Sequence, residues 1–239
     1  MTKTTPEPLM LWADFISRSR PQPDATVSYG PDDLHKVDVW VPAGAGPFKT
    51  VLMVHGGCWQ TSVADRGLMS WISADLRDAG YAVWNIDYRG VDRAGGGYPG
   101  TFADAAAAAD ALRANAASFR LDPTRIVAVG HSAGGHLALW LAARHRIAAA
   151  SVLHAAHPLP IAHVVSLGGL PDLEANAEAE DNGCGTEVIA RLVGAASPAR
   201  PDVFADTSVP RLLPLGVPQD LVNGENDAII PARLGTGYA

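Results

Sequence analysis

Residues 130–134 read Gly-His-Ser-Ala-Gly and lie between two apolar segments of different character. The run Arg125–Val129 before them has the length and content of a buried strand. The stretch His136–Ala143 after them is rich in alanine and leucine and predicts a helix. The sequence therefore predicts a strand, a tight turn with Ser132 at its apex, and a helix.

The two glycines of this turn decide its geometry. A side chain at Gly130 or Gly134 would clash with the neighbouring strand or helix, so the apex residue is expected in a strained backbone conformation. The Ser132 hydroxyl then projects outward, and the free N–H groups of the following helix face whatever it attacks. In this context Gly-x-Ser-x-Gly is a nucleophile elbow, which predicts acyl-transfer chemistry.

Composition narrows the class of protein. The chain has 239 residues, 48% of them hydrophobic, which is enough for one domain with a sizeable core. Its formal net charge of −7 argues against nucleic acid as a partner, because nucleic-acid binding needs a basic face. No segment approaches the roughly 18 apolar residues of a membrane-spanning helix, and residues 1–8 show no secretory signal. We interpret Cys58 and Cys184 as two reduced thiols and expect a cytoplasmic location.

Short apolar runs alternate with helical stretches along the chain. Strands are predicted at 36–41, 50–54, 81–86, 125–129, 162–167 and 219–223, and helices at 68–79, 101–119 and 136–143. Residues 1–34 are interpreted as an N-terminal leader, and residues 170–216 as a cap-like excursion within a single domain, 1–239. This alternation predicts the α/β class, with a mainly parallel, doubly wound sheet and helices on both faces.

Three polar groups follow predicted strands: the His-Gly-Gly run at 55–57, Ser132 and Asp227. In a parallel sheet, reactive groups gather beyond the carboxyl ends of the strands. Their shared placement therefore predicts that they meet in one site.

The runs His-Gly-Gly-x-Trp at 55–59, Gly-His-Ser-Ala-Gly-Gly-His at 130–136 and Gly-x-x-Asp at 224–227 together resemble the α/β-hydrolase fold. Within it they are most similar to the esterase and kynurenine formamidase (arylformamidase) branch, near the hormone-sensitive-lipase-like esterases. The resemblance implies a serine hydrolase that acts on a carboxylic ester or aryl formamide through an acyl-enzyme. It implies a small-molecule substrate as partner, with no metal and no cofactor.

The chemistry assigns roles to the residues of these runs. Ser132 is the expected nucleophile, and it needs a base because a free alcohol is a poor nucleophile at neutral pH. The tetrahedral intermediate needs N–H donors, and we expect them from Ala133, Gly57 and Cys58. Gly56 and Gly57 let that loop bend towards the substrate oxygen.

The sequence allows two interpretations each for Trp59 and for Asp227. Trp59 is either a wall of the substrate pocket or a structural tryptophan that holds its loop. Asp227 fits the acid that orients a catalytic histidine, because it follows a strand and the order serine, acid, histidine suits this fold. The alternative is an Asx-turn that caps residues 229–231, and Glu225 is a weaker rival for the acid.

The catalytic histidine is missing from its expected place, because no histidine follows Asp227. We expect none of the other histidines to replace it: His55 supports its loop, His131 diverges from the hydroxyl, and His136 packs under the elbow. The remaining five are expected at the opposite end of the sheet (His154, His157 and His163) or at the surface (His35 and His145).

The resemblance therefore predicts an α/β-hydrolase domain that lacks its final strand and histidine loop, apparently truncated at the C-terminus and impaired in activity. Without that strand, residues 221–222 would form an exposed edge, which favours pairing with another chain and leaves a homo-oligomer open. Two alternatives for function remain: a non-catalytic binding relic of the fold, and a serine peptidase of the same fold. The peptidase is disfavoured because the chain has no room for a propeller domain.

Overall fold

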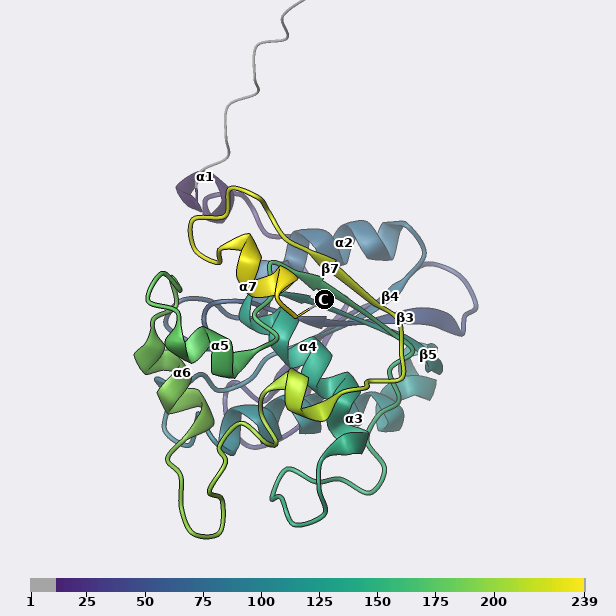
Figure 1. Ribbon diagram of the computed structural model, residues 1–239. Coiled ribbons are helices and arrows are strands. Elements are labelled where there is room, and N and C mark those ends of the chain that lie inside the picture. Colours follow the sequence, from purple (N-terminus) through teal and green to yellow (C-terminus); the bar gives the residue numbers. More distant parts are fainter. Residues whose placement is uncertain (1–11, 239) are drawn as a thin grey trace, which may run out of the picture.

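A computed structural model describes residues 12–238, and a seven-stranded sheet forms its centre (Figure 1). The strands are β1 (Ala25–Ser28), β2 (Lys36–Trp40), β3 (Phe48–Val54), β4 (Ala82–Ile86), β5 (Leu121–His131), β6 (His163–Leu167) and β7 (Gln219–Val222). Their order across the sheet is β1-β2-β4-β3-β5-β6-β7. β2 runs antiparallel to β1 and β4, and the other neighbouring pairs are parallel. The mainly parallel sheet confirms the predicted α/β class.

Helices cover both faces of this sheet, with α2 on one face and α3 and α4 on the other (Figure 1). The α-helices are α1 (Trp12–Ile16), α2 (Ser70–Asp78), α3 (Gly100–Phe119), α4 (Ala133–Ala143), α5 (Leu173–Glu178), α6 (Thr186–Val193) and α7 (Ala232–Thr236). Three 3₁₀ turns accompany them: η1 (Arg66–Met69), η2 (Arg144–Arg146) and η3 (Val209–Leu212).

The core has two parts because the sheet is buried on both sides. The larger part lies under α3 and α4 and contains Trp84, Phe102 and Trp140. The smaller part lies under α2 and contains Trp40 and Met53. All of α4 is buried, as expected of a helix that is apolar all round. The helix that follows the elbow is therefore held firmly against the sheet.

Part of the segment that the sequence analysis interprets as an N-terminal leader, residues 1–34, belongs to the sheet. Residues 1–11 of that segment lie outside the described residues, but residues 12–34 contain α1 and the strand β1. β1 pairs with β2 in a register that places Ala25 opposite Val39. Its four residues alternate between half-buried and exposed, and prolines and glycines flank the segment, so its strand signal is weak. Of the described residues, 25–28 therefore belong to the sheet.

The excursion at 170–216 contains α5, α6 and η3 and no strand of the sheet, as predicted. Its later part is fastened to α4 by two buried hydrogen bonds. The ring of His136 bonds through Nε2 to the carbonyl oxygen of Thr207 (2.8 Å), and Trp140 Nε1 donates to that of Asp206 (2.8 Å). The excursion is thus anchored directly beneath the elbow helix.

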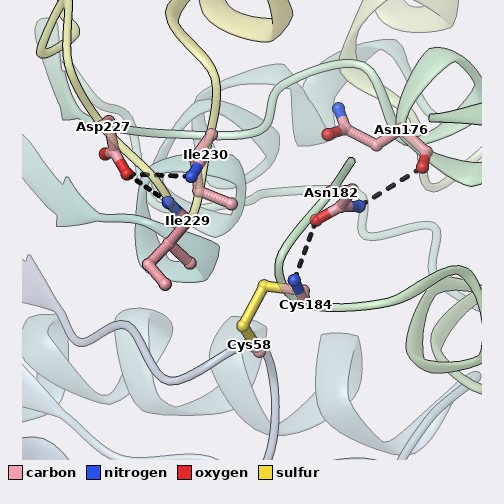
Figure 2. Close-up of a disulfide and its surroundings, with 7 residues drawn as sticks. All are labelled: Cys58, Asn176, Asn182, Cys184, Asp227, Ile229 and Ile230. Atoms are coloured by element: carbon pink, nitrogen blue, oxygen red, sulfur yellow. Dashed lines mark hydrogen bonds between the residues drawn. A yellow bond between two sulfur atoms is a disulfide. The ribbon is translucent and has the colours of Figure 1, made fainter. Parts of the chain in front are cut away.

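A disulfide joins Cys58 to Cys184, so the prediction of two reduced thiols is wrong (Figure 2). The two cysteines are separated by 126 positions, and their Cα atoms lie 5.3 Å apart. Such a separation carries no spacing signal in the sequence. Only the folded chain brings the loop after β3 against the excursion.

The last strand, β7, is an edge of the sheet, with β6 as its one hydrogen-bonded neighbour among residues 12–238. Val222 on this strand is 55% exposed, which agrees with the expected open edge. The helix α7 follows, and Tyr238 beyond it donates from its hydroxyl to Gln219 Oε1 (2.6 Å). Within the described range, no helix is both long and apolar enough to span a bilayer. Pairing of the open edge with another chain stays a prediction.

The disulfide predicts a measurable contribution to stability. Closing a loop across 126 positions restricts the unfolded chain, and we expect reduction with dithiothreitol to lower the free energy of unfolding by about 2–5 kcal/mol. Urea titrations followed by circular dichroism, with and without reductant, measure this difference. The Cys184→Ala variant is the control, because reductant should leave its midpoint unchanged. Equal midpoints for the oxidised and reduced wild-type chain would contradict the prediction.

Candidate active site

Ser132 occupies the turn between β5 and α4 with φ 54° and ψ −122°. A non-glycine residue in such a conformation costs on the order of 1–3 kcal/mol, so the surrounding structure must hold it. The Ser132 N–H donates to the carbonyl oxygen of Leu167 (2.8 Å), and its own carbonyl oxygen accepts from Gly135 N (2.8 Å). The backbone conformation confirms the predicted elbow at the carboxyl edge of the sheet.

The glycines on either side of Ser132 are required by close backbone contacts. A Cβ on Gly130 would overlap the carbonyl oxygen of Gly134, and a Cβ on Gly134 would overlap that of Val54. Both neighbours are backbone atoms, which cannot rotate away as a side chain can. The predicted reason for these two glycines is therefore confirmed.

The loop at residues 55–59, which we call the His-Gly-Gly loop, lies beside the elbow. A Cβ on Gly56 would lie 2.8 Å from the carbonyl oxygen of His131 and 3.1 Å from Ser132 Cβ. No side chain fits in that space, so the loop backbone approaches the serine directly. The sequence placed these two segments at the same edge of the sheet, and the structure brings them into contact.

The next residues of the loop have unusual backbone angles. Gly57 has φ 111°, Cys58 has φ 51° and Trp59 has φ 53°. The left-handed region costs a non-glycine residue roughly 1–2 kcal/mol, so Cys58 and Trp59 are both strained. Such strain persists only where other contacts over-determine the conformation.

Several backbone N–H groups in this region have no hydrogen-bond acceptor within residues 12–238, and those of Gly57, Cys58 and Ala133 are among them. Ala133 is the first residue of α4, where the N–H has no partner inside the helix. The other two belong to the His-Gly-Gly loop, which contacts Ser132 through Gly56. From the sequence we expect these three groups as donors to a substrate oxygen, and that role stays a prediction.

His55 ties the loop to the neighbouring strand β4. Its Nε2 lies 3.0 Å from Asp87 Oδ1, and its Nδ1 lies 2.7 Å from the carbonyl oxygen of Gly56. The ring stacks on Tyr88 with a centroid distance of 4.3 Å, and the Tyr88 hydroxyl donates to the carbonyl oxygen of His55 (2.9 Å). His55 therefore supports the loop, as expected.

Asp87 is the centre of this support and was not singled out from the sequence. Its buried carboxylate also accepts from Arg66 Nη1 (2.9 Å) and from the N–H of Tyr88 (3.1 Å). Burial by itself would raise the Asp87 pKa, but the hydrogen bonds and positive charges of His55 and Arg66 outweigh burial and lower the pKa. The available signal was its position directly after β4, at the same edge as the other site residues.

Asp227 lies at this edge as well. Its Oδ1 accepts from the N–H groups of Ile229 (2.8 Å) and Ile230 (2.9 Å), so the hydrogen bonds of the Asx-turn alternative are present (Figure 2). Its Oδ2 is directed elsewhere: a Cβ on Gly168, directly after β6, would lie 3.6 Å from it. The turn occupies one carboxylate oxygen and leaves the other for a second partner. Glu225, the weaker rival, is exposed.

Trp59 is structural, and the pocket-wall prediction is corrected. Its side chain is completely buried and meets the ring of His136 edge-on at 5.5 Å. Its carbonyl oxygen accepts from Val91 N (2.7 Å). A side chain enclosed by the core has no surface to offer a ligand, because the loop turns it inward beneath the elbow.

The other histidines mostly lie where they were expected. His136 is buried under the elbow, and burial lowers its pKa to about 4. Loss of hydration around the His131 ring lowers the pKa of His131 as well, although the negative charge of Asp227 opposes this shift. His35 is the exception: it is buried and bonds through Nε2 to Asp104 Oδ1 (3.1 Å), so its surface prediction is wrong. No side chain in the described range hydrogen-bonds to the Ser132 hydroxyl.

Residues 37–236 match the BD-FAE family. The chain belongs to this family. Its structure is similar to a bifunctional GH43-CE protein of Bacteroides eggerthii, with a TM-score of 0.69 and 26% identity over 89% of this chain and 32% of that one. It also resembles a truncated form of a carbohydrate esterase from gut microbiota, with a TM-score of 0.74 and 24% identity over 92% and 85% of the two chains. These likenesses confirm the α/β-hydrolase fold of this BD-FAE domain.

A curated relative is a probable isoprenylcysteine alpha-carbonyl methylesterase of Oryza sativa subsp. japonica. It is 32% identical over 114 residues, which make up 47% of this chain and 26% of the relative. The BD-FAE chain thus spans about a quarter of that protein and about a third of the Bacteroides protein.

The lowered pKa of Asp87 predicts a pH-dependent part of the stability. A carboxylate with a lowered folded-state pKa contributes stability above its unfolded pKa, near 3.8, and loses it as the pH falls through the folded value. We therefore expect acidification from about pH 5 to about pH 2 to lower the free energy of unfolding more in the wild type than in Asp87→Asn. Denaturant titrations at several pH values measure this. Asp33→Asn, at an exposed position, should follow the wild type, and parallel curves for all three proteins would refute the assignment.

Proposed function

We propose that this BD-FAE domain hydrolyses a carboxylic ester, with Ser132 as the nucleophile. Ser132 Oγ attacks the carbonyl carbon and gives its proton to a base, and the alcohol leaves with a proton to form an acyl-enzyme. Water then attacks the acyl group, releases the acid and restores the hydroxyl. The observation that carries this proposal is the strained serine in a region where the N–H groups of Gly57, Cys58 and Ala133 lack acceptors.

The N–H groups of Gly57, Cys58 and Ala133 are the proposed oxyanion hole. They come from a strained loop and a helix start, so they are oriented before any substrate binds and need not reorganise during the reaction. Losing one such donor costs roughly 3 kcal/mol of transition-state stabilisation.

Asp227 is the proposed acid that orients the base. Its Oδ1 is held by the turn to Ile229 and Ile230, which leaves Oδ2 to receive an imidazole N–H. Residues 228–239 contain no histidine to donate this N–H, so impaired activity is proposed for the given residues by themselves. A serine and an oxyanion hole retain part of the rate enhancement when the rest of the triad is absent.

An ester is the first candidate substrate, because the similar proteins are named as esterases. An aryl formamide is the second candidate, on the resemblance of the residue runs alone. In both cases the partner is a small molecule, and the chemistry requires no cofactor. The disulfide favours an oxidising compartment over the cytoplasm expected from reduced thiols.

The proposed nucleophile predicts labelling by a fluorophosphonate probe. We expect mass spectrometry to place the phosphonate on Ser132 and Ser132→Ala to abolish labelling, because only an activated serine reacts readily. Turnover of p-nitrophenyl acetate against N-formylkynurenine then separates ester from formamide. A probe that leaves the folded wild type unlabelled would favour a binding relic instead.

The tight space around Gly56 predicts that a side chain there slows the reaction of Ser132 with the fluorophosphonate probe. A methyl group there would lie 2.7 Å from His131 Nδ1 and 2.8 Å from the His131 carbonyl oxygen, so the His-Gly-Gly loop must shift. We expect Gly56→Ala to slow phosphonylation by about 10–100-fold, because displaced donors stabilise the oxyanion less. Gly80→Ala is the control: its φ of 93° is also strained for alanine, but the space around it is open. Equal slowing in both variants would indicate general destabilisation.

A further inference from the structure

The disulfide connects the His-Gly-Gly loop to a second anchored segment (Figure 2). On the excursion side, the N–H of Cys184 donates to Asn182 Oδ1 (3.0 Å), and Asn182 Nδ2 donates to the carbonyl oxygen of Asn176 in α5 (3.2 Å). Cys184 and Asn182 are both buried. The sulfur of Cys184 is therefore a fixed point to which Cys58 is attached.

The same segment reaches the turn that contains Asp227. The N–H of Gly183, between the two anchored residues, donates to the carbonyl oxygen of Ile229 (2.8 Å). A Cβ on Gly183 would lie 2.7 Å from that oxygen and 3.0 Å from Ile229 Cα, so the two backbones are in close contact. Ile229 is one of the two residues whose N–H groups hold Asp227 Oδ1. A continuous path thus runs from Cys58 through residues 183–184 to Asp227.

The strain in the His-Gly-Gly loop indicates what this path does. Trp59 is held in its left-handed conformation by complete burial of its side chain. Cys58 has the same kind of conformation but is only half-buried, and its side chain is anchored by the disulfide. Strain of this kind relaxes when the contacts that impose it are removed. Breaking the disulfide would therefore free the residue whose N–H is a proposed oxyanion donor.

We propose that the Cys58–Cys184 disulfide is a positioning device that holds Cys58 N–H and the Asp227 turn in their catalytic places, and that a dithiol reductant switches it off. The reductant passes two electrons and two protons to the S–S bond. The two cysteines become thiols, and the dithiol becomes a cyclic disulfide. This inference rests on the proposed role of Ser132. Reduction then slows acylation, since it loosens a donor that acts in the transition state, and leaves substrate binding almost unchanged.

The test compares oxidised wild type, wild type reduced with dithiothreitol, and Cys184→Ala, which breaks the bridge and keeps the Cys58 backbone. At a temperature where circular dichroism shows all three folded, we expect kcat for p-nitrophenyl acetate to fall about 10-fold on reduction, with KM changed less than about 2-fold. The kcat of Cys184→Ala should equal that of the reduced wild type and should not change when dithiothreitol is added. Val188→Ala removes a buried side chain of α6 but keeps the bridge, so it should retain kcat and its sensitivity to reductant.

Hydrogen exchange tests the path to Asp227 without relying on activity. Reduction should speed exchange of the Gly183, Ile229 and Ile230 amides about 10-fold, because these N–H groups are held along the path. Unchanged exchange there would refute the coupling to the Asp227 turn. Unchanged kcat, with Ser132 still labelled by fluorophosphonate, would overturn the positioning role and leave the proposed function standing. A loss of kcat in Val188→Ala equal to that in Cys184→Ala would show general loosening and overturn it as well. Absence of labelling in both redox states would overturn both proposals.

Discussion

The close backbone contact of β3, β5 and α4 around Ser132 is the constraint on which the site depends. A Cβ on Gly130 would overlap the Gly134 carbonyl oxygen, and a Cβ on Gly134 would overlap that of Val54, so only glycine fits where the strand, the turn and the helix meet. This packing holds Ser132 at φ 54°, a conformation that a free chain would leave. Because α4 is buried along its whole length, the helix cannot move away to release the strain. The serine is thus positioned by the core of the domain.

The His-Gly-Gly loop applies the same principle with different supports. The start of the loop is fixed to the end of β4 by Asp87, whose buried carboxylate hydrogen-bonds to the side chains of His55 and Arg66. Burial of Trp59 fixes its end, and the disulfide fixes Cys58 between them. Three supports around two strained residues leave the loop few alternative conformations. Backbone donors held in this way suit the proposed oxyanion hole, because they need no reorganisation when charge develops on a substrate oxygen.

The local parts of the site could be predicted because each is encoded within a few neighbouring residues. The elbow follows from two glycines around a serine between a strand and a helix, and the predicted strands after β1 lie close to their observed positions. Asp227 could be placed by its position after a strand. Its place in the turn and its proposed role as the acid could not be separated, because the turn and the free oxygen involve different atoms of one carboxylate. β1 was missed because four alternating residues between turn formers carry little strand signal.

By itself, the sequence determined the order of strands and helices, the elbow at Ser132 and the edge of the sheet where the polar groups gather. These properties depend on local periodicity and on glycine, which act over short stretches of chain. Only the tertiary structure decided which distant residues meet: Cys58 with Cys184, His35 with Asp104, and Asp87 with Arg66. The burial of Trp59 is of the same kind, because it depends on how its loop turns over His136. Such contacts arise from packing between segments far apart in the chain, and no spacing in the sequence records them.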